Sequence, residues 1–140
     1  MPERDVPDAL IPHRGPARLV QTILEDPRPD VLVCAGRVPP DSAFAVGGRV
    51  PAVVVLELAA QAAAVQQALA AGAAGAARPG YLVGIRDASL QADDVAVSAR
   101  LVATVRRTGQ AGPLATYDVT VNGTEGEEVL RATLSTHVGE

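Results

Sequence analysis

The sequence predicts an α+β fold in which an antiparallel sheet of about six strands curls around one long central helix. Residues 50–72 form one long segment that is apolar almost all round, as in a buried helix. The segments on both sides read as strands, and apolar and polar residues alternate clearly over 114–121 and 128–138. The predicted order is two strands, one helix and four strands. Because an antiparallel sheet must cover its apolar face and only one helix is available, we expect the sheet to wrap that helix.

The central helix is predicted over about residues 51–72. Pro51 stands where a helix tolerates proline, in the first turn, and Gly72 supplies a stop. The segment is apolar almost all round, so it should be buried on most sides. It is long enough to cross a membrane, but its many alanines, its glutamines and Glu57 favour a core helix, and we expect no membrane association.

Two strands are predicted before the helix, over residues 18–25 and 31–38, with a proline-bearing turn at 26–30 between them. The N-terminal segment 1–18 has no clear period, and we expect a short helical turn near residues 10–14. A loop over 39–49 leads to the helix.

Four strands are predicted after the helix, and the chain 1–140 is expected to form one domain. They cover residues 80–90, 96–107, 114–121 and 128–138. Gly84 is expected at a bulge or a close approach of two backbones. In the third of these strands Tyr117, Val119 and Val121 should face inward, and Asn122-Gly123 should open the following turn.

Composition excludes several classes of function. The net charge is −4, lysine is absent and aromatic residues make up 2% of the chain, so we expect no nucleic-acid partner. A single cysteine, Cys34, excludes an internal disulfide and a cysteine-based metal site. The charged, proline-bearing N-terminus is unlike a signal peptide, and we expect a cytoplasmic protein. No metal or cofactor signature is present.

Glu57 is the one charge within the apolar helix segment, and Gln61 lies four residues on, on the same face. A carboxylate among apolar residues is costly to bury unless it is paired or neutral. Two interpretations stay open: Glu57 reaches a wet edge or a backbone group, or it is a catalytic acid tuned by burial. Gly47 and Gly48 precede the helix, whose free N–H groups can receive an oxyanion, although most such glycine pairs are only turns.

These elements and three short motifs resemble the hotdog-fold 3-hydroxyacyl-acyl carrier protein dehydratases. Residues 10–16 (LIPHRGP) resemble the family's opening segment, and residues 50–61 (VPAVVVLELAAQ) resemble the start of its central helix. Residues 80–85 (GYLVGI) resemble its next strand. The resemblance covers nearly the whole chain and implies a hotdog fold, a thioester substrate on acyl carrier protein, and a dimer.

The resemblance also implies an active site made of a loop histidine and a helix acid, one from each subunit of the dimer. Glu57 matches the acid. The loop at residues 44–50 (FAVGGRV) holds no histidine and is most similar to dehydratase-like proteins of aryl-polyene gene clusters. His13 is then the candidate for the second proton transfer, by elimination, unless it only anchors the N-terminal segment. His137 is expected on the solvated outer face.

The expected function is dehydration of 3-hydroxyacyl thioesters carried on acyl carrier protein, in fatty-acid or aryl-polyene biosynthesis. Two alternatives stay open. One is a hotdog thioesterase, in which a helix carboxylate directs water to the thioester. The other is a non-catalytic hotdog subunit, and the dimer is either a homodimer or a pairing with a homologous chain. The expected catalytic residues are Glu57 and His13, and the expected substrate-binding residues are Gly47, Gly48, Pro51, Ala52 and Gln61.

Overall fold

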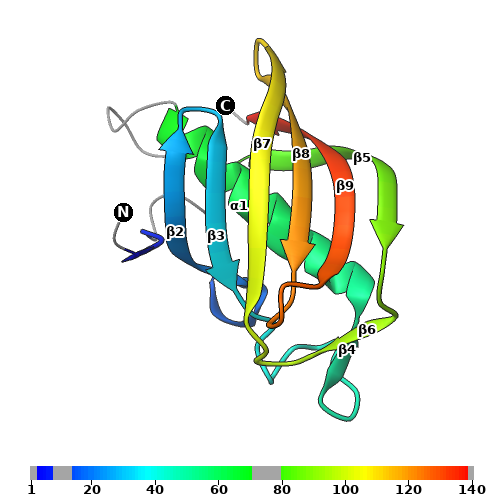
Figure 1. Cartoon of the computed structure of the whole chain (residues 1–140). Helices are drawn as coiled ribbons and strands as arrows, with labels where there is room; N and C mark the ends of the chain where they lie inside the picture. Colours follow the sequence, from blue (N-terminus) through cyan, green and yellow to red (C-terminus); the bar gives the residue numbers. More distant parts are fainter. Residues whose placement is uncertain (1–2, 8–13, 71–79, 139–140) are drawn as a thin grey trace.

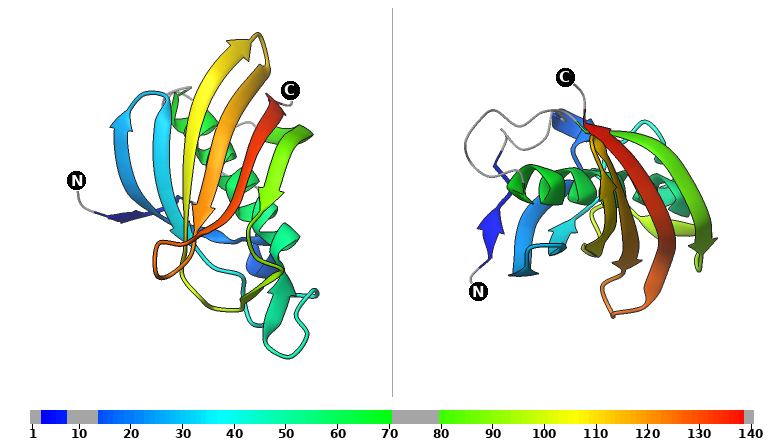
Figure 2. Two further views of the ribbon diagram at one scale, coloured as in Figure 1. Left: turned by 45° about the vertical axis from the view of Figure 1, so that its right-hand side comes forward. Right: turned by 90° about the horizontal axis from the view of Figure 1, so that it is seen from above.

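A seven-stranded antiparallel sheet curls around a single helix in the computed structural model (Figure 1), which describes residues 3–7, 14–70 and 80–138. The sheet order is β1-β2-β3-β7-β8-β9-β5, and β4 and β6 form a separate two-stranded ribbon. Seen from above, the helix lies against the concave side of the sheet (Figure 2). The predicted α+β architecture is confirmed.

The elements follow the predicted order, with short additions. The strands are β1 (Arg4–Asp5), β2 (Val20–Arg28), β3 (Val31–Gly36), β4 (Arg49–Pro51), β5 (Gly80–Leu90), β6 (Asp94–Ala96), β7 (Leu101–Ala111), β8 (Leu114–Asn122) and β9 (Glu128–Val138). The helical elements are η2 (Gly15–Ala17), η3 (Ala52–Val54) and α1 (Val55–Ala70).

The helix begins with η3 and continues into α1. The segment Ala52–Ala70 is long and apolar enough to cross a membrane by composition, with a mean hydropathy of 1.5, but it is the core helix of the curled sheet. The helical segment begins at Ala52, one residue later than predicted, and Pro51 is the last residue of β4. The Ala52 N–H still belongs to the ribbon, because it donates to the Asp93 carbonyl. The predicted stop at Gly72 lies outside the described residues.

The core lies between α1 and the inner face of the sheet. Leu58, Ala62 and Val65 of the helix are fully buried, as are Tyr117 and Leu134 of the sheet. Each large apolar side chain in such a core contributes about 1.5–3 kcal/mol relative to an exposed one. The inward positions predicted for Tyr117, Val119 and Val121 are confirmed by their burial.

Buried glutamines attach the helix to the surrounding chain. Gln66 donates from Nε2 to the Pro29 carbonyl (2.6 Å) and accepts from the Tyr117 hydroxyl at Oε1 (2.8 Å). Gln67 accepts from the Thr136 hydroxyl (3.2 Å). Burial raises the pKa of Tyr117 to about 12, and the positive charge of Arg107 opposes this shift. Each buried amide is thus paired, as a low-dielectric core requires.

β2 extends further than predicted, through Pro27 to Arg28, where the sequence analysis placed a turn at 26–30. The pairing of β2 with β3 shifts register between Ile23 and Glu25 and again before Arg28. Such irregular steps accommodate a proline, which cannot donate to the ladder. The turn is therefore confined to Pro29 and Asp30.

The single strand predicted over 96–107 is two strands. β6 pairs with β4 rather than with the main sheet, and β7 begins at Leu101 and continues to Ala111. Between them the chain reverses at Ser98, whose φ of 67° is unusual for a residue with a side chain. The bulge expected at Gly84 is confirmed by a register shift between Leu82 and Gly84.

The loop before the helix ends in a tight hairpin at the tip of the ribbon (Figure 1). Val46 and Arg49 exchange both backbone hydrogen bonds (2.8 and 3.1 Å) around Gly47 and Gly48. Both glycines have positive φ, 59° and 76°, which is the conformation that such two-residue turns require. Of the helical turn predicted near 10–14, residues 10–13 lie outside the described residues, and η2 follows them.

Candidate active site

An apolar pocket of about 610 Å³ lies beside the start of the helix. Its walls come from the beginning of β2, the loop after β3, the end of β4, the first helical turns and β5. The lining residues are Ala17, Leu19, Val38, Ser42, Ala43, Phe44, Pro51, Val53, Val54, Leu56, Glu57 and Leu82. Pockets of this size and lining are typical for small molecules with an apolar portion.

Glu57 is the only titratable side chain among the described residues that line this pocket. It lies in the first turn of α1 and is exposed in the single chain. In this chain by itself, the exposure of Glu57 fits the first of the two open interpretations, in which the carboxylate reaches a wet edge. The sheet covers the opposite faces of the helix, whereas Glu57 and Val53 are exposed on its open side, with Ala60 and Ala64 half-buried.

Gln61 lies beneath the pocket and is fully buried. Its Oε1 accepts from the N–H groups of Leu19 (2.8 Å) and Val20 (3.1 Å). Its Nε2 donates to the Ala17 carbonyl (2.6 Å) and to Glu57 Oε1 (3.3 Å). The predicted shared face of Glu57 and Gln61 is confirmed. Gln61 does not line the pocket, and its two acceptor and two donor sites are used within the chain.

Of the other four predicted substrate-binding residues, one lines the pocket and three do not. Pro51 lines the pocket. Ala52 does not line it and donates its N–H to the Asp93 carbonyl (2.9 Å). Gly47 and Gly48 form the hairpin turn of the ribbon and do not line it either.

Val53 and Val54 are pocket residues that the sequence analysis missed. Both line the pocket in η3, the first helical turn. The Val53 N–H precedes the first i→i+3 hydrogen bond of this turn, so it has no partner within the helix and meets the positive end of the helix dipole. It is therefore better placed than the Ala52 N–H to donate to a carbonyl oxygen in the pocket. The sequence did indicate that the helix starts near Pro51. It could not show which first-turn N–H would be bonded to the ribbon and so be unable to bind a substrate.

The two histidines do not meet Glu57 in the part of the chain that the structure describes. His13 lies outside the described residues. His137 follows Thr136, which contacts Gln67 of the helix, and neighbouring strand residues point to opposite faces. His137 is thus half-buried on the outer face of the sheet, away from the helix.

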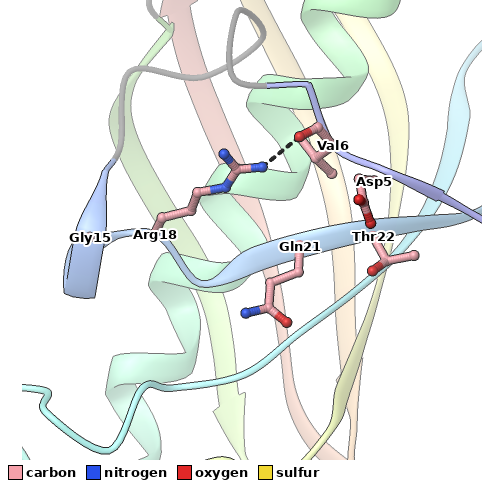
Figure 3. A pocket seen from close by; sticks show the side chains of 6 residues that line it. All are labelled: Asp5, Val6, Gly15, Arg18, Gln21 and Thr22. Carbon is pink, nitrogen blue, oxygen red and sulfur yellow. Dashed lines mark hydrogen bonds between the residues drawn. The ribbon is translucent and has the colours of Figure 1, made fainter.

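Arg18, between Ala17 and Leu19, points away from this pocket and into a separate one (Figure 3). It donates to the carbonyls of Val6 (2.5 Å) and Val20 (3.2 Å). These bonds attach the chain before β2 to the segment that follows β1.

The curled sheet, the single core helix and an apolar pocket at the helix start define a hotdog-fold protein. Solved structures agree. A hypothetical thioesterase from Streptococcus pneumoniae, solved with coenzyme A, has a TM-score of 0.61 at 18% identity, covering 84% of each chain. The Escherichia coli PaaI protein has a TM-score of 0.59 at 17% identity, covering 82% of this chain and 80% of that one.

The chain belongs to the ApeP-like dehydratase family, whose model, described as ApeP dehydratase, matches residues 6–139. The dehydratase heterocomplex ApeI:P from Xenorhabdus doucetiae has a TM-score of 0.83 at 20% identity, covering 98% of this chain and 92% of that one. No curated protein matches the chain. The predicted hotdog fold, and the resemblance to dehydratase-like proteins of aryl-polyene clusters, are confirmed.

Proposed function

We propose that this family member takes part directly in the dehydration of 3-hydroxyacyl thioesters held on acyl carrier protein, with Glu57 as a proton-transfer group. The observation that carries the proposal is the position of Glu57, a carboxylate at the edge of an otherwise apolar pocket at the helix start. The same proposal places the protein in the cytoplasm, which fits a single cysteine, Cys34, that is buried and in no disulfide.

The reaction breaks the C2–H and C3–O bonds, forms the C2=C3 double bond and releases water. It needs a base for the C2 proton, an acid for the hydroxyl, and donors for the thioester carbonyl. Glu57 supplies one proton transfer. The first-turn N–H of Val53 is the donor that fits the carbonyl, and the aliphatic walls fit the acyl chain.

The second proton-transfer group is proposed to come from a partner hotdog subunit or from His13. Exposed apolar residues surround the pocket and continue along β5, namely Phe44, Val53, Leu82, Val83 and Ile85. Within the described part of the chain, β5 pairs only with β9, so its other edge is available for another chain. The solved ApeI:P structure is a complex of two different chains, which supports a heterodimer here.

The test is turnover of 3-hydroxyacyl and 2-enoyl chains on acyl carrier protein by the complex isolated from its native host. Replacing Glu57 with glutamine keeps the shape of the side chain and removes its proton transfer. We expect the rate to fall by about 10²–10⁴-fold. Glu25→Gln, an exposed change on β2, is the control and should retain the wild-type rate. Wild-type turnover by the Glu57 variant would refute the assignment, and release of the carrier thiol would favour a thioesterase.

A further inference from the structure

We propose that Gln61 is a positioning residue that holds Glu57 and one wall of the pocket through a single buried amide. This inference rests on the proposed role of Glu57.

The orientation of the Gln61 amide is determined by the backbone. The N–H groups of Leu19 and Val20 both point at one end of the amide, at 2.8 and 3.1 Å. Because an N–H can only donate, that end must be the oxygen. The nitrogen then faces the Ala17 carbonyl (2.6 Å), which can only accept, and Glu57 Oε1 (3.3 Å). A flipped amide would oppose like groups at all four contacts, in a site with no exposure to solvent.

This orientation distinguishes the two oxygens of Glu57. Oε1 accepts a hydrogen bond from Gln61 Nε2, and an oxygen facing this donor is poorly placed to carry a proton itself. The helix spacing of four residues places the two side chains in register, so the contact needs no distortion of α1.

The same amide holds the pocket wall. Ala17 and Leu19 line the pocket, and their backbone groups bond to Gln61, so the distance between this wall and the carboxylate depends on one side chain. Gln66 provides a matched comparison. It is a buried glutamine on the same helix, and it also makes a hydrogen bond to a distant backbone carbonyl, but it has no bond to Glu57.

The first experiment compares Gln61→Met with Gln66→Met in the isolated complex. Both changes remove a buried amide, so both should lower the unfolding temperature. Only Gln61→Met should lower kcat, by about 10–100-fold with KM changed by less than about threefold, since small misplacements of a reacting group can cost about 10²-fold. In a Glu57→Asp background, whose carboxylate no longer reaches Gln61, the further effect of Gln61→Met on kcat should largely vanish. Equal kcat losses in the two methionine variants would overturn the inference.

A second experiment needs no activity. In the ¹⁵N-labelled chain, Glu57→Gln should shift the side-chain NH₂ resonances of Gln61 and leave those of Gln66 unchanged, whereas the control Glu25→Gln should shift neither. Unchanged Gln61 resonances would overturn the inference even in an active enzyme. A clear shift in a protein that shows no dehydration in any assembly would instead refute the proposed function, and the positioning role with it.

Discussion

Gly36, the last residue of β3, leaves no space for a side chain. A Cβ at this position would fall on the carbonyl oxygen of Leu19 and within 2.8 Å of Leu58 Cδ1. The strand cannot easily retreat, because the Arg37 N–H donates to the same Leu19 carbonyl (3.1 Å). Close packing of β3 against the chain that lines the pocket therefore depends on a glycine here.

We predict that Gly36→Ala lowers the free energy of unfolding by about 1–3 kcal/mol, as overpacking of a core does. Urea denaturation measures this change. Gly109→Ala, in β7, is the control, because a Cβ there meets nothing within 4 Å and its backbone is not left-handed. Similar losses for the two variants would show that the collision at Gly36 is absent.

Tyr117 gives the stability of the fold a specific dependence on alkaline pH. Its pKa is raised from 10.0 in the unfolded chain to about 12 by burial. Below pH 10 the phenol is protonated in both states and its contribution is complete. Between pH 10 and 12 the unfolded state loses the proton and the folded state keeps it, so stability falls as pH rises, by about 2–3 kcal/mol in total.

Chemical denaturation at several pH values between 9 and 12 checks this prediction. Tyr117→Phe should be less stable at pH 9 by about 1–2 kcal/mol, because Gln66 Oε1 loses its donor. The variant should also lose the part of the pH dependence that Tyr117 causes. An unchanged alkaline slope in the variant would mean that another group titrates.

At the scale of elements, the strands with clear alternation were predictable and the ribbon was not. β5 and β9 have the predicted bounds, and apolar and polar residues alternate clearly along β9. β4 and β6 are three residues each, too short to show a period, and only their pairing defines them. The predicted loop 39–49 and the predicted strand 96–107 were therefore both wrong where they meet the ribbon, at β4 and β6.

The candidate site was predictable only in part, for a related reason. The spacing of Glu57 and Gln61 placed both on one helix face, but the partners of Gln61 lie more than forty residues away in sequence. The open side of α1 is also apolar or alanine-rich, so periodicity could not separate the covered faces from the one where Glu57 is exposed. Both the backbone partners of Gln61 and the open side of α1 are determined by contacts between residues far apart in the sequence.

The element that joins this chain to another is predicted to be β5. We expect Val83→Lys to weaken the complex at least about tenfold, roughly 1.4 kcal/mol, because it places a charge on an exposed apolar strand beside the pocket. Light scattering after size exclusion measures the mass, and circular dichroism checks the fold. Leu114→Lys is the control, since Leu114 is equally apolar and exposed but lies at the start of β8. A complex that withstands the Val83 change and not the Leu114 change would place the interface elsewhere.

At the scale of the whole molecule, the fold provides half of a reaction centre. The curled sheet and its helix present a pocket, a carboxylate and a first-turn N–H donor at one place. Among the described residues that line the pocket, nothing supplies a second proton transfer. Under the proposed function, the exposed apolar strand next to the pocket would bind a second subunit, and that subunit would complete the site unless His13 supplies the second group.

The most direct measurement of this account follows 3-hydroxyacyl and 2-enoyl chains on acyl carrier protein by mass spectrometry, with the chain alone and with its co-purified partner. It records the gain or loss of water and the release of the carrier thiol separately. The account predicts exchange of water without thiol release, strongest in the complex and lost in Glu57→Gln. Thiol release, or water exchange that survives the loss of the Glu57 carboxylate, would contradict it.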